Sequence, residues 1–208
     1  MISTPERSPE RDAAIEAMLP SVAFTGWSMR TLLEAAGPDA DLLFPGGAVD
    51  MVETYVDWAD RRMEAAASAR DMSALRVPAR VRGVIALRLE QSRPHKEPIR
   101  RALGVLALPQ NTAVAARTAA RTVDAIWHAA GDRSADFSWY TKRAILTPIY
   151  GATLLYWLRD DSLEDEATLA FLDRRLAGVG GIGRVRRRVE SAMRRFRPGG
   201  SDAPEASP

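Results

Sequence analysis

One uncharged and mostly apolar run limits most strongly what this chain can fold into. The run AILTPIYGATLLYWL, residues 144–158, holds fifteen uncharged residues between Arg143 and Arg159. A helix that is apolar on every side is normally buried on every side. The run is shorter than the roughly 20 residues that a membrane-spanning helix needs, and Pro148 would kink it. We therefore expect a central helix that other helices wrap, in an all-α domain.

The remainder of the chain favours the same fold class. Runs of alternating β-branched residues between Asn-Gly or Asp-Gly turns are missing from the sequence, whereas Ala-rich stretches with helical periodicity dominate it. Pro94, Pro109 and Gly131 separate these stretches. Helices are predicted at about 8–23, from Ser28 to Gly37, and at 47–69, 78–91, 96–107, 110–130, 135–159 and 164–178.

A bundle packed around one central helix can leave an elongated apolar cavity between its helices. The residues of the uncharged run that are predicted to line such a pocket are Ile149, Leu154, Leu155 and Leu158. The alternative is a solidly packed core, which is the more common outcome for a helix of this kind.

The stretch GWSMRTLLEAAGPDADLLFPGG, residues 26–47, resembles the start of a TetR-type repressor. A DNA-reading helix needs Arg, Lys, Asn or Gln for base edges and cations for phosphates. Residues 38–50 contain three Asp and neither Lys nor Arg. We therefore expect a helix-turn-helix remnant that packs the N-terminal subdomain and binds no nucleic acid. The positions that match the motif's apolar contacts, helix cap and turn are Phe24, Gly26, Trp27, Ser28, Leu32, Ala35, Ala36 and Gly37.

Positive charge is concentrated in one terminal segment. Residues 182–198 hold seven Arg and one Glu, or +6, although the whole chain carries only +2. At about 100° per residue these positions form an apolar stripe opposite a cationic face, which is typical of a helix that lies on an anionic membrane. Two alternatives are docking of the stripe on the bundle and binding of nucleic acid by the Arg run. The stripe contains Ile182, Val185, Val189, Met193 and Phe196, and the cationic face contains Arg184, Arg187 and Arg188.

Catalytic signatures are not found in the sequence. Cysteine is absent, which excludes disulfides, thiolate metal sites and thiol nucleophiles. His128 lies one turn after Asp124, a spacing that can share a metal, but no second pair completes a site. The GxGxxG of residues 178–183 follows a helix rather than a strand, so it predicts a hinge and not a nucleotide site. We expect a protein that is not an enzyme and has no metal and no cofactor.

The segment GDRSADFSWYTKRAILTPIYGATLLYWLRDDS, residues 131–162, strongly resembles the ubiquinone-biosynthesis accessory family Coq-nine. That family's pattern runs Gly-Asp-x-Ser-Thr-Asp-Phe-Asn-Trp-Tyr-Thr-Lys-Arg, and here Ala135 and Ser138 replace the usual Thr and Asn. Further similarity lies in HKEPIRRAL (95–103), LALP (106–109) and FLDRR (171–175). The matching positions of the main pattern are Gly131, Asp132, Ser134, Asp136, Phe137, Trp139, Tyr140, Thr141, Lys142 and Arg143.

The resemblance implies a TetR-like helical bundle and an accessory role in ubiquinone biosynthesis. Such a protein binds a hydrophobic isoprenoid lipid or quinone intermediate at the membrane surface and presents it to a demethoxyubiquinone hydroxylase. The resemblance also implies that Trp139, Tyr140 and Arg143 meet the hydroxylase, and that a C-terminal amphipathic helix contacts the membrane. Trp139 and Arg143 share one helical face at i and i+4, and Trp, Tyr and Arg are enriched at interface hot spots. The alternative is that Trp139 and Tyr140 are core residues at the edge of the bundle.

A TetR-type lipid-sensing transcriptional regulator is the alternative function. We expect a homodimer, and the high Arg and Ala content and a start without an apolar signal-peptide region favour a cytoplasmic protein, peripheral on a bacterial inner membrane. The predicted parts of the chain are a disordered N-terminus (1–7), a helix-turn-helix-like subdomain (8–69), a helical lipid-binding domain (70–178), the amphipathic cationic helix (182–198) and a disordered tail (199–208).

Overall fold

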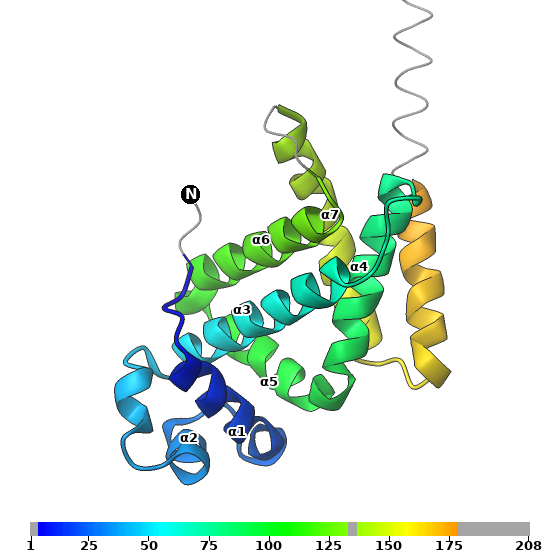
Figure 1. The fold of residues 1–208 in the computed structure, drawn as a ribbon. Helices are drawn as coiled ribbons and strands as arrows, with labels where there is room; N and C mark the ends of the chain where they lie inside the picture. The colour runs from blue at the N-terminus through cyan, green and yellow to red at the C-terminus, as the bar shows by residue number, and fades with distance from the viewer. Residues whose placement is uncertain (1–3, 133–136, 179–208) are drawn as a thin grey trace, which may run out of the picture.

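The computed structural model describes residues 4–132 and 137–178, and within these ranges the fold is all-α without strands (Figure 1). The predicted helices are confirmed, with ends that shift by a few residues. The predicted amphipathic helix 182–198 and the tail 199–208 lie outside the described residues. The elements are α1 (Pro9–Thr25), α2 (Met29–Ala36), η1 (Ala40–Leu43), α3 (Gly47–Ser68), α4 (Val77–Ser92), η2 (Arg93–His95), α5 (Lys96–Leu106), η3 (Pro109–Asn111), α6 (Thr112–Ala129), α7 (Phe137–Trp157), η4 (Leu163–Asp165) and a last helix at 166–178.

Helix α3 connects the two parts of the molecule. It packs along α6 and also contacts α1 and α4. Figure 1 shows α1, α2 and η1 grouped at one end, while α4, α7 and the last helix lie at the other. Near the start of the described chain, Arg7 donates hydrogen bonds of 2.9 and 2.7 Å to the carboxylate of Asp57 on α3. That contact gives part of the segment 1–7, expected to be disordered, a defined place.

Local capping explains why α1 and α2 begin and end where they do. Ser8 and Ser28 each accept a hydrogen bond from a backbone N–H three residues later, at 3.2 Å, which satisfies a donor that the helix itself leaves open. Gly26 and Gly37 follow the two helices with φ of 79° and 99°, a region that favours glycine. The predicted cap and stop of the second helix are therefore confirmed. Phe24 is 82% exposed, so the expectation that it makes an apolar contact is wrong.

The exposure of Phe24 follows from the helical period. The buried side of α1 includes Met18, Leu19 and Val22, and a residue two positions beyond Val22 points about 200° away from it.

The segment where a DNA-reading helix would lie is only the four-residue 3₁₀ turn η1. Arg11 of α1 is buried beneath it and donates to the carbonyl of Leu43, to the carboxylate of Asp50 and to the hydroxyl of Thr54. A buried guanidinium is tolerated only when it is paired and hydrogen-bonded. Arg11 therefore fixes the turn η1 and the start of α3 to α1.

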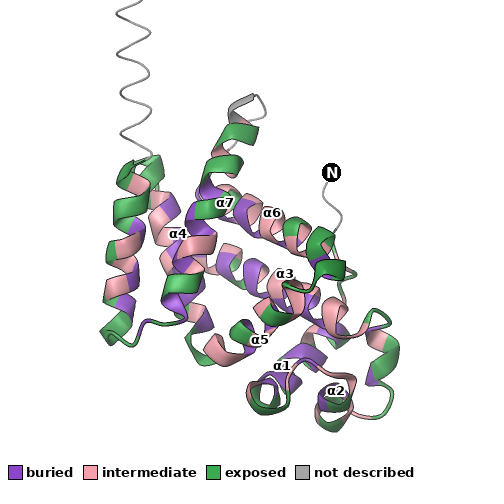
Figure 2. Ribbon diagram, turned by 180° about the vertical axis from the view of Figure 1, so that it is seen from behind, coloured by how far each residue is buried: buried purple, intermediate pink, exposed green. Residues whose placement is uncertain are grey.

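Helix α7 is not wrapped on all sides, so that expectation is wrong. Its buried side chains include Leu146 and Trp157, but Ile145, Leu155 and Tyr156 are 38%, 59% and 39% exposed. Figure 2 shows exposed residues where the N-terminal part of α7 extends beyond its neighbours. An uncharged sequence sets no limit on how many helices surround it, and here the neighbours cover only part of the circumference.

Candidate functional site

An apolar cavity of about 370 Å³ lies among α3, α4, α5, α6 and α7. Its volume falls within the range of roughly 300–1,000 Å³ that is typical of small-molecule sites. The predicted alternative of a solidly packed core therefore does not describe this bundle. The larger apolar side chains of the lining come from all five helices and include Val56, Leu89, Ile99, Leu106, Val123 and Leu154.

Small residues on three helices leave this space open. Ala102 lies on α5, Ala115 and Ala119 lie one turn apart on α6, and Gly151 lies on α7. A Cβ atom placed on Gly151 would meet no other atom within 4 Å. The cavity opens to solvent where Ala107 and Thr147 are exposed, and a hollow of this size between helices is typical of a ligand site. In the sequence, only the i, i+4 pair of alanines on α6 indicated this space. Such pairs are too common in helices to predict a cavity.

Only Leu154 of the four predicted pocket residues lines the cavity. Leu155 is 59% exposed, while Ile149 and Leu158 are buried outside the lining. The reason is the rotation of α7, because each further residue turns the side chain by about 100°. The face of α7 that meets the cavity has the helical spacing i, i+3, i+4 and i+7 and consists of Thr147, Tyr150, Gly151 and Leu154.

A buried ion pair forms a polar part of the cavity wall. The Arg88 Nε atom of α4 donates to Asp60 Oδ1 of α3 at 3.0 Å, and both side chains are about 5% exposed. Thr122 of α6 donates to Asp60 Oδ2 at 2.7 Å, and Arg88 Nη1 donates to Ser92 Oγ at 2.6 Å. Burial raises the pKa of the Asp60 carboxyl, against the opposing effects of Arg88 and Thr122. Removing one partner of such a pair typically costs about 3–5 kcal/mol, because a buried charge is left uncompensated.

Two buried tyrosines stand near this pair. Burial raises the pKa of Tyr55 to about 12, and burial also raises the pKa of Tyr150. Both phenols therefore keep their protons at neutral pH and act as hydrogen-bond donors. The cavity thus combines a long apolar wall with a few protonated donors, an arrangement that suits an amphiphile with a small polar head.

The predicted docking residues form a compact cluster at the start of α7. The rings of Trp139 and Tyr140 meet edge to face with centroids 4.7 Å apart, and the Arg143 guanidinium lies 3.9 Å from the Trp139 centroid. The expected sharing of one helical face by Trp139 and Arg143 is therefore found. Lys142 Nζ donates to Asp132 Oδ1 at 2.7 Å, which connects α7 to the end of the preceding described segment.

The three docking residues differ in how far they reach solvent. Tyr140 is 67% exposed, so the alternative that it is a core residue is wrong. Trp139 is half-buried, and the Arg143 side chain is only 14% exposed. Arg143 Nε donates to Asp124 Oδ1 of α6 at 2.6 Å. Its charge therefore serves mainly to hold the Trp139 ring and the start of α7 against α6.

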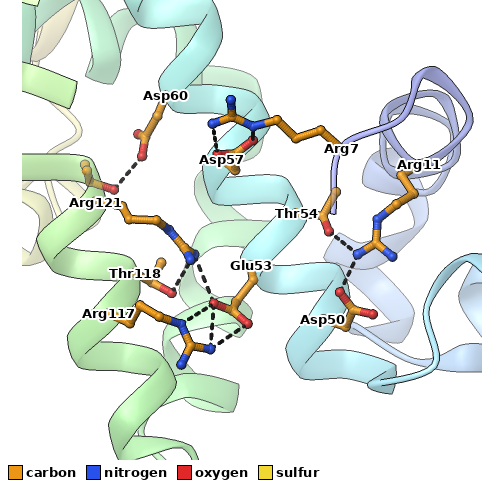
Figure 3. A network of polar contacts seen from close by, with 11 residues as sticks. Arg7, Arg11, Asp50, Glu53, Thr54, Asp57, Asp60, Arg117, Thr118 and Arg121 are labelled. Carbon is orange, nitrogen blue, oxygen red and sulfur yellow. Dashed lines mark hydrogen bonds and ion pairs between the residues drawn. The ribbon is translucent and has the colours of Figure 1, made fainter. Parts of the chain in front are cut away.

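Trp139 and Tyr140 also line a second hollow, a polar groove of about 660 Å³ shared with α3 and α6. Figure 3 shows ion pairs between the same two helices, in which Glu53 of α3 bridges Arg117 and Arg121 of α6. Asp60 lines this groove, whereas its partners Arg88 and Thr122 line the apolar cavity. The buried ion pair therefore stands between the cavity and the groove.

His128, the candidate metal ligand, forms no hydrogen bond or ion pair with Asp124 in the described part of the chain. His128 is 82% exposed and its Nδ1 lies 3.3 Å from Glu64 Oε1 on α3. Across residues 4–132 and 137–178, His, Asp and Glu side chains form no group of three or more that could hold a metal ion. In the same ranges, no helix has the length and apolar character needed to cross a membrane.

Comparison with known proteins identifies relatives of this sequence. Residues 112–183 match the model of the COQ9 family. The chain is 40% identical over 111 residues to the ubiquinone biosynthesis protein COQ9, mitochondrial, of Rattus norvegicus, a match that covers 53% of this chain and 36% of that protein. It is 31% identical over 137 residues to the corresponding Schizosaccharomyces pombe protein, covering 64% of this chain and 53% of that one. The chain thus spans about a third to a half of the length of these relatives.

A solved structure confirms the TetR-like all-α fold. The crystal structure of a TetR transcriptional regulator from Nitrosomonas europaea superposes with a TM-score of 0.66 and 24% identity, over 82% of this chain and 97% of that one. The expected location on a bacterial inner membrane is wrong, because the curated relatives are named as mitochondrial proteins. Arg and Ala content carries no address signal, which is why composition misled this expectation. The expected homodimer stays a prediction.

Proposed function

Because residues 112–183 belong to the COQ9 family, we propose that this protein serves ubiquinone biosynthesis as a non-catalytic accessory protein. It binds a hydrophobic isoprenoid intermediate and presents it to a partner hydroxylase. The observation that carries this proposal is the apolar cavity of about 370 Å³ among α3 to α7. Burial of apolar surface contributes roughly 25 cal/mol per Å², so even a ring with a few isoprene carbons gains several kcal/mol there. The remainder of a long tail would have to leave the cavity.

The direct test is mass spectrometry of lipids extracted from the full-length protein after purification without detergent. We expect prenylated quinones or phenols in amounts that approach the protein concentration, because a buried apolar ligand dissociates slowly. Protein purified in parallel and delipidated should regain these lipids from membranes. Recovery of phospholipids only, in proportion to carry-over in a control protein, would contradict the proposal.

Trp139 and Tyr140, the aromatic residues that line the groove, support the proposed presentation of the lipid to a hydroxylase. An exposed tyrosine against a half-buried tryptophan offers the residue types and partial burial that are common at binding hot spots. Asp60 and its partner Arg88 lie between this surface and the cavity. A hydroxylase docked at Trp139 and Tyr140 would therefore meet the bundle next to the stored ligand. Arg143 acts in this arrangement as a positioning residue for Trp139.

The cationic segment 182–198 supplies the proposed membrane contact. Its seven Arg and apolar stripe favour reversible binding to anionic bilayers, at about 1 kcal/mol per Arg near the surface. Protein truncated before residue 182 should lose flotation with cardiolipin-containing liposomes, and 0.5 M salt should weaken binding of the full chain. Protein that lacks only 199–208 is the control and should still float. Unchanged flotation after the longer truncation would remove this segment from the membrane contact.

DNA binding receives no support from the corresponding segment of this chain. The turn η1 and its flanks carry Asp39 and Asp41 where a repressor would present cations, and η1 is too short to enter a major groove as a helix. The regulator alternative therefore rests on the fold likeness only, and fold does not determine function.

A further inference from the structure

Tyr150 is a buried phenol that faces the cavity without a protein partner for its hydroxyl. Its side chain is only 8% exposed, and it lines the cavity on the face of α7 that also carries Gly151 and Leu154. Within the described part of the chain, its hydroxyl makes no hydrogen bond. Because this hydroxyl is not fully enclosed by the protein, a group bound in the cavity can reach it and provide its hydrogen bond.

Arg88 gives this position a second polar group. The Arg88 and Tyr150 side chains lie near enough for each to influence the pKa of the other. Arg88 donates to Asp60 and to Ser92, which use two of the five N–H donors that a guanidinium carries. The phenol and the guanidinium thus mark one polar region on a wall that is otherwise mainly apolar.

We propose that Tyr150, with Arg88 beside it, donates a hydrogen bond to a carbonyl or phenolic oxygen of a neutral ring at the head of the ligand. This inference rests on the proposed lipid-binding function and assigns the orientation of the ligand within the cavity. The ring lies at α4 and α7, and the first isoprene units follow the apolar side chains of α5, which include Leu103 and Leu106.

Charge favours a neutral head over an anionic one. The positive charge of Arg88 is already balanced by Asp60 at 3.0 Å. A carboxylate or phosphate head would therefore add an uncompensated negative charge to a site of low dielectric, which is costly. A quinone or phenol needs only a hydrogen-bond donor and brings no charge. The site accordingly selects neutral ring amphiphiles against fatty acids, whose heads carry a net negative charge.

Replacement of the phenol hydroxyl provides the test. Tyr150→Phe removes one oxygen and keeps the ring, so folding should be unaffected. The matched control is Tyr156→Phe on the same helix, because Tyr156 stacks on Phe171 outside the cavity. Three probes are titrated into delipidated full-length protein: a benzoquinone with a short alkyl tail, a carboxylate on the same alkyl tail, and farnesene, an isoprenoid hydrocarbon without oxygen. Binding is followed by calorimetry and melting by circular dichroism.

The expected pattern separates this inference from the function on which it rests. Tyr150→Phe should weaken quinone binding by about tenfold, in line with a lost buried hydrogen bond, and should leave farnesene binding unchanged. Tyr156→Phe should bind all probes as wild type does. Equal quinone affinity of Tyr150→Phe and wild type, or tighter binding of the carboxylate than of the quinone, would overturn the assigned head-group site. Failure of the wild type to bind any probe would instead overturn the lipid-binding function.

Discussion

Gly151→Leu should weaken ligand binding by nearly two orders of magnitude while the protein stays folded. Gly151 lies within α7 on the cavity wall, where a new Cβ meets no atom within 4 Å, so a leucine side chain has space to enter the cavity. If it displaces ~100 Å² of ligand contact, at roughly 25 cal/mol per Å² the loss is about 2.5 kcal/mol, or nearly two orders of magnitude in Kd. Replacing a helical glycine should raise the free energy of unfolding by about 0.5–1 kcal/mol.

The matched control for this change is Gly104→Leu. Gly104 also lies inside a helix, α5, and a Cβ there also meets open space, but the residue is exposed and does not line the cavity. Calorimetric titration with the short-tailed benzoquinone and thermal melting should show weakened binding for Gly151→Leu only, with both variants at least as stable as wild type. Full affinity in Gly151→Leu would mean that the cavity is not where the ligand binds.

Tyr140→Lys should weaken association with the proposed partner hydroxylase by at least about tenfold, because loss of an aromatic hot spot commonly costs 2 kcal/mol or more. Tyr140 is 67% exposed, so this change should leave the melting temperature and lipid binding almost unchanged. A change at Trp139 would be harder to interpret. The Arg143 guanidinium lies 3.9 Å from the Trp139 ring, so loss of the ring is also expected to lower the stability of the fold.

Phe24→Lys supplies the control for the docking surface. Phe24 is another exposed aromatic, at 82%, but it lies on α1 and lines neither the cavity nor the groove. Pull-down or biolayer interferometry with the proposed partner, a demethoxyubiquinone hydroxylase, as the probe should separate the two variants. Equal loss in both would indicate a nonspecific effect of added charge, and normal association of Tyr140→Lys would exclude this surface from the interface.

Features that depend on neighbouring residues could be predicted from the sequence. The Ser28 cap and the stop at Gly37 were predicted correctly because capping acts within a few residues of the helix end. The charges of residues 38–50 argued against a DNA-reading helix, and the structure has only the short turn η1 there. The resemblance to the COQ9 family was read from the block at residues 131–143, and the match to that family's model includes this block. The i, i+4 contact of Trp139 with Arg143 is local in the same sense.

Only the tertiary structure decided which side of each helix meets the cavity. A rotation of about 100° per residue separates Leu154, which lines it, from Leu155, which is exposed, and both are leucines in an uncharged run. The polar wall joins Asp60, Arg88 and Thr122 from three helices, a coincidence in space that no local pattern encodes. Helix identity depends on contacts within one turn, whereas a cavity and its donors depend on how separate helices are rotated and packed, which a single sequence does not reveal.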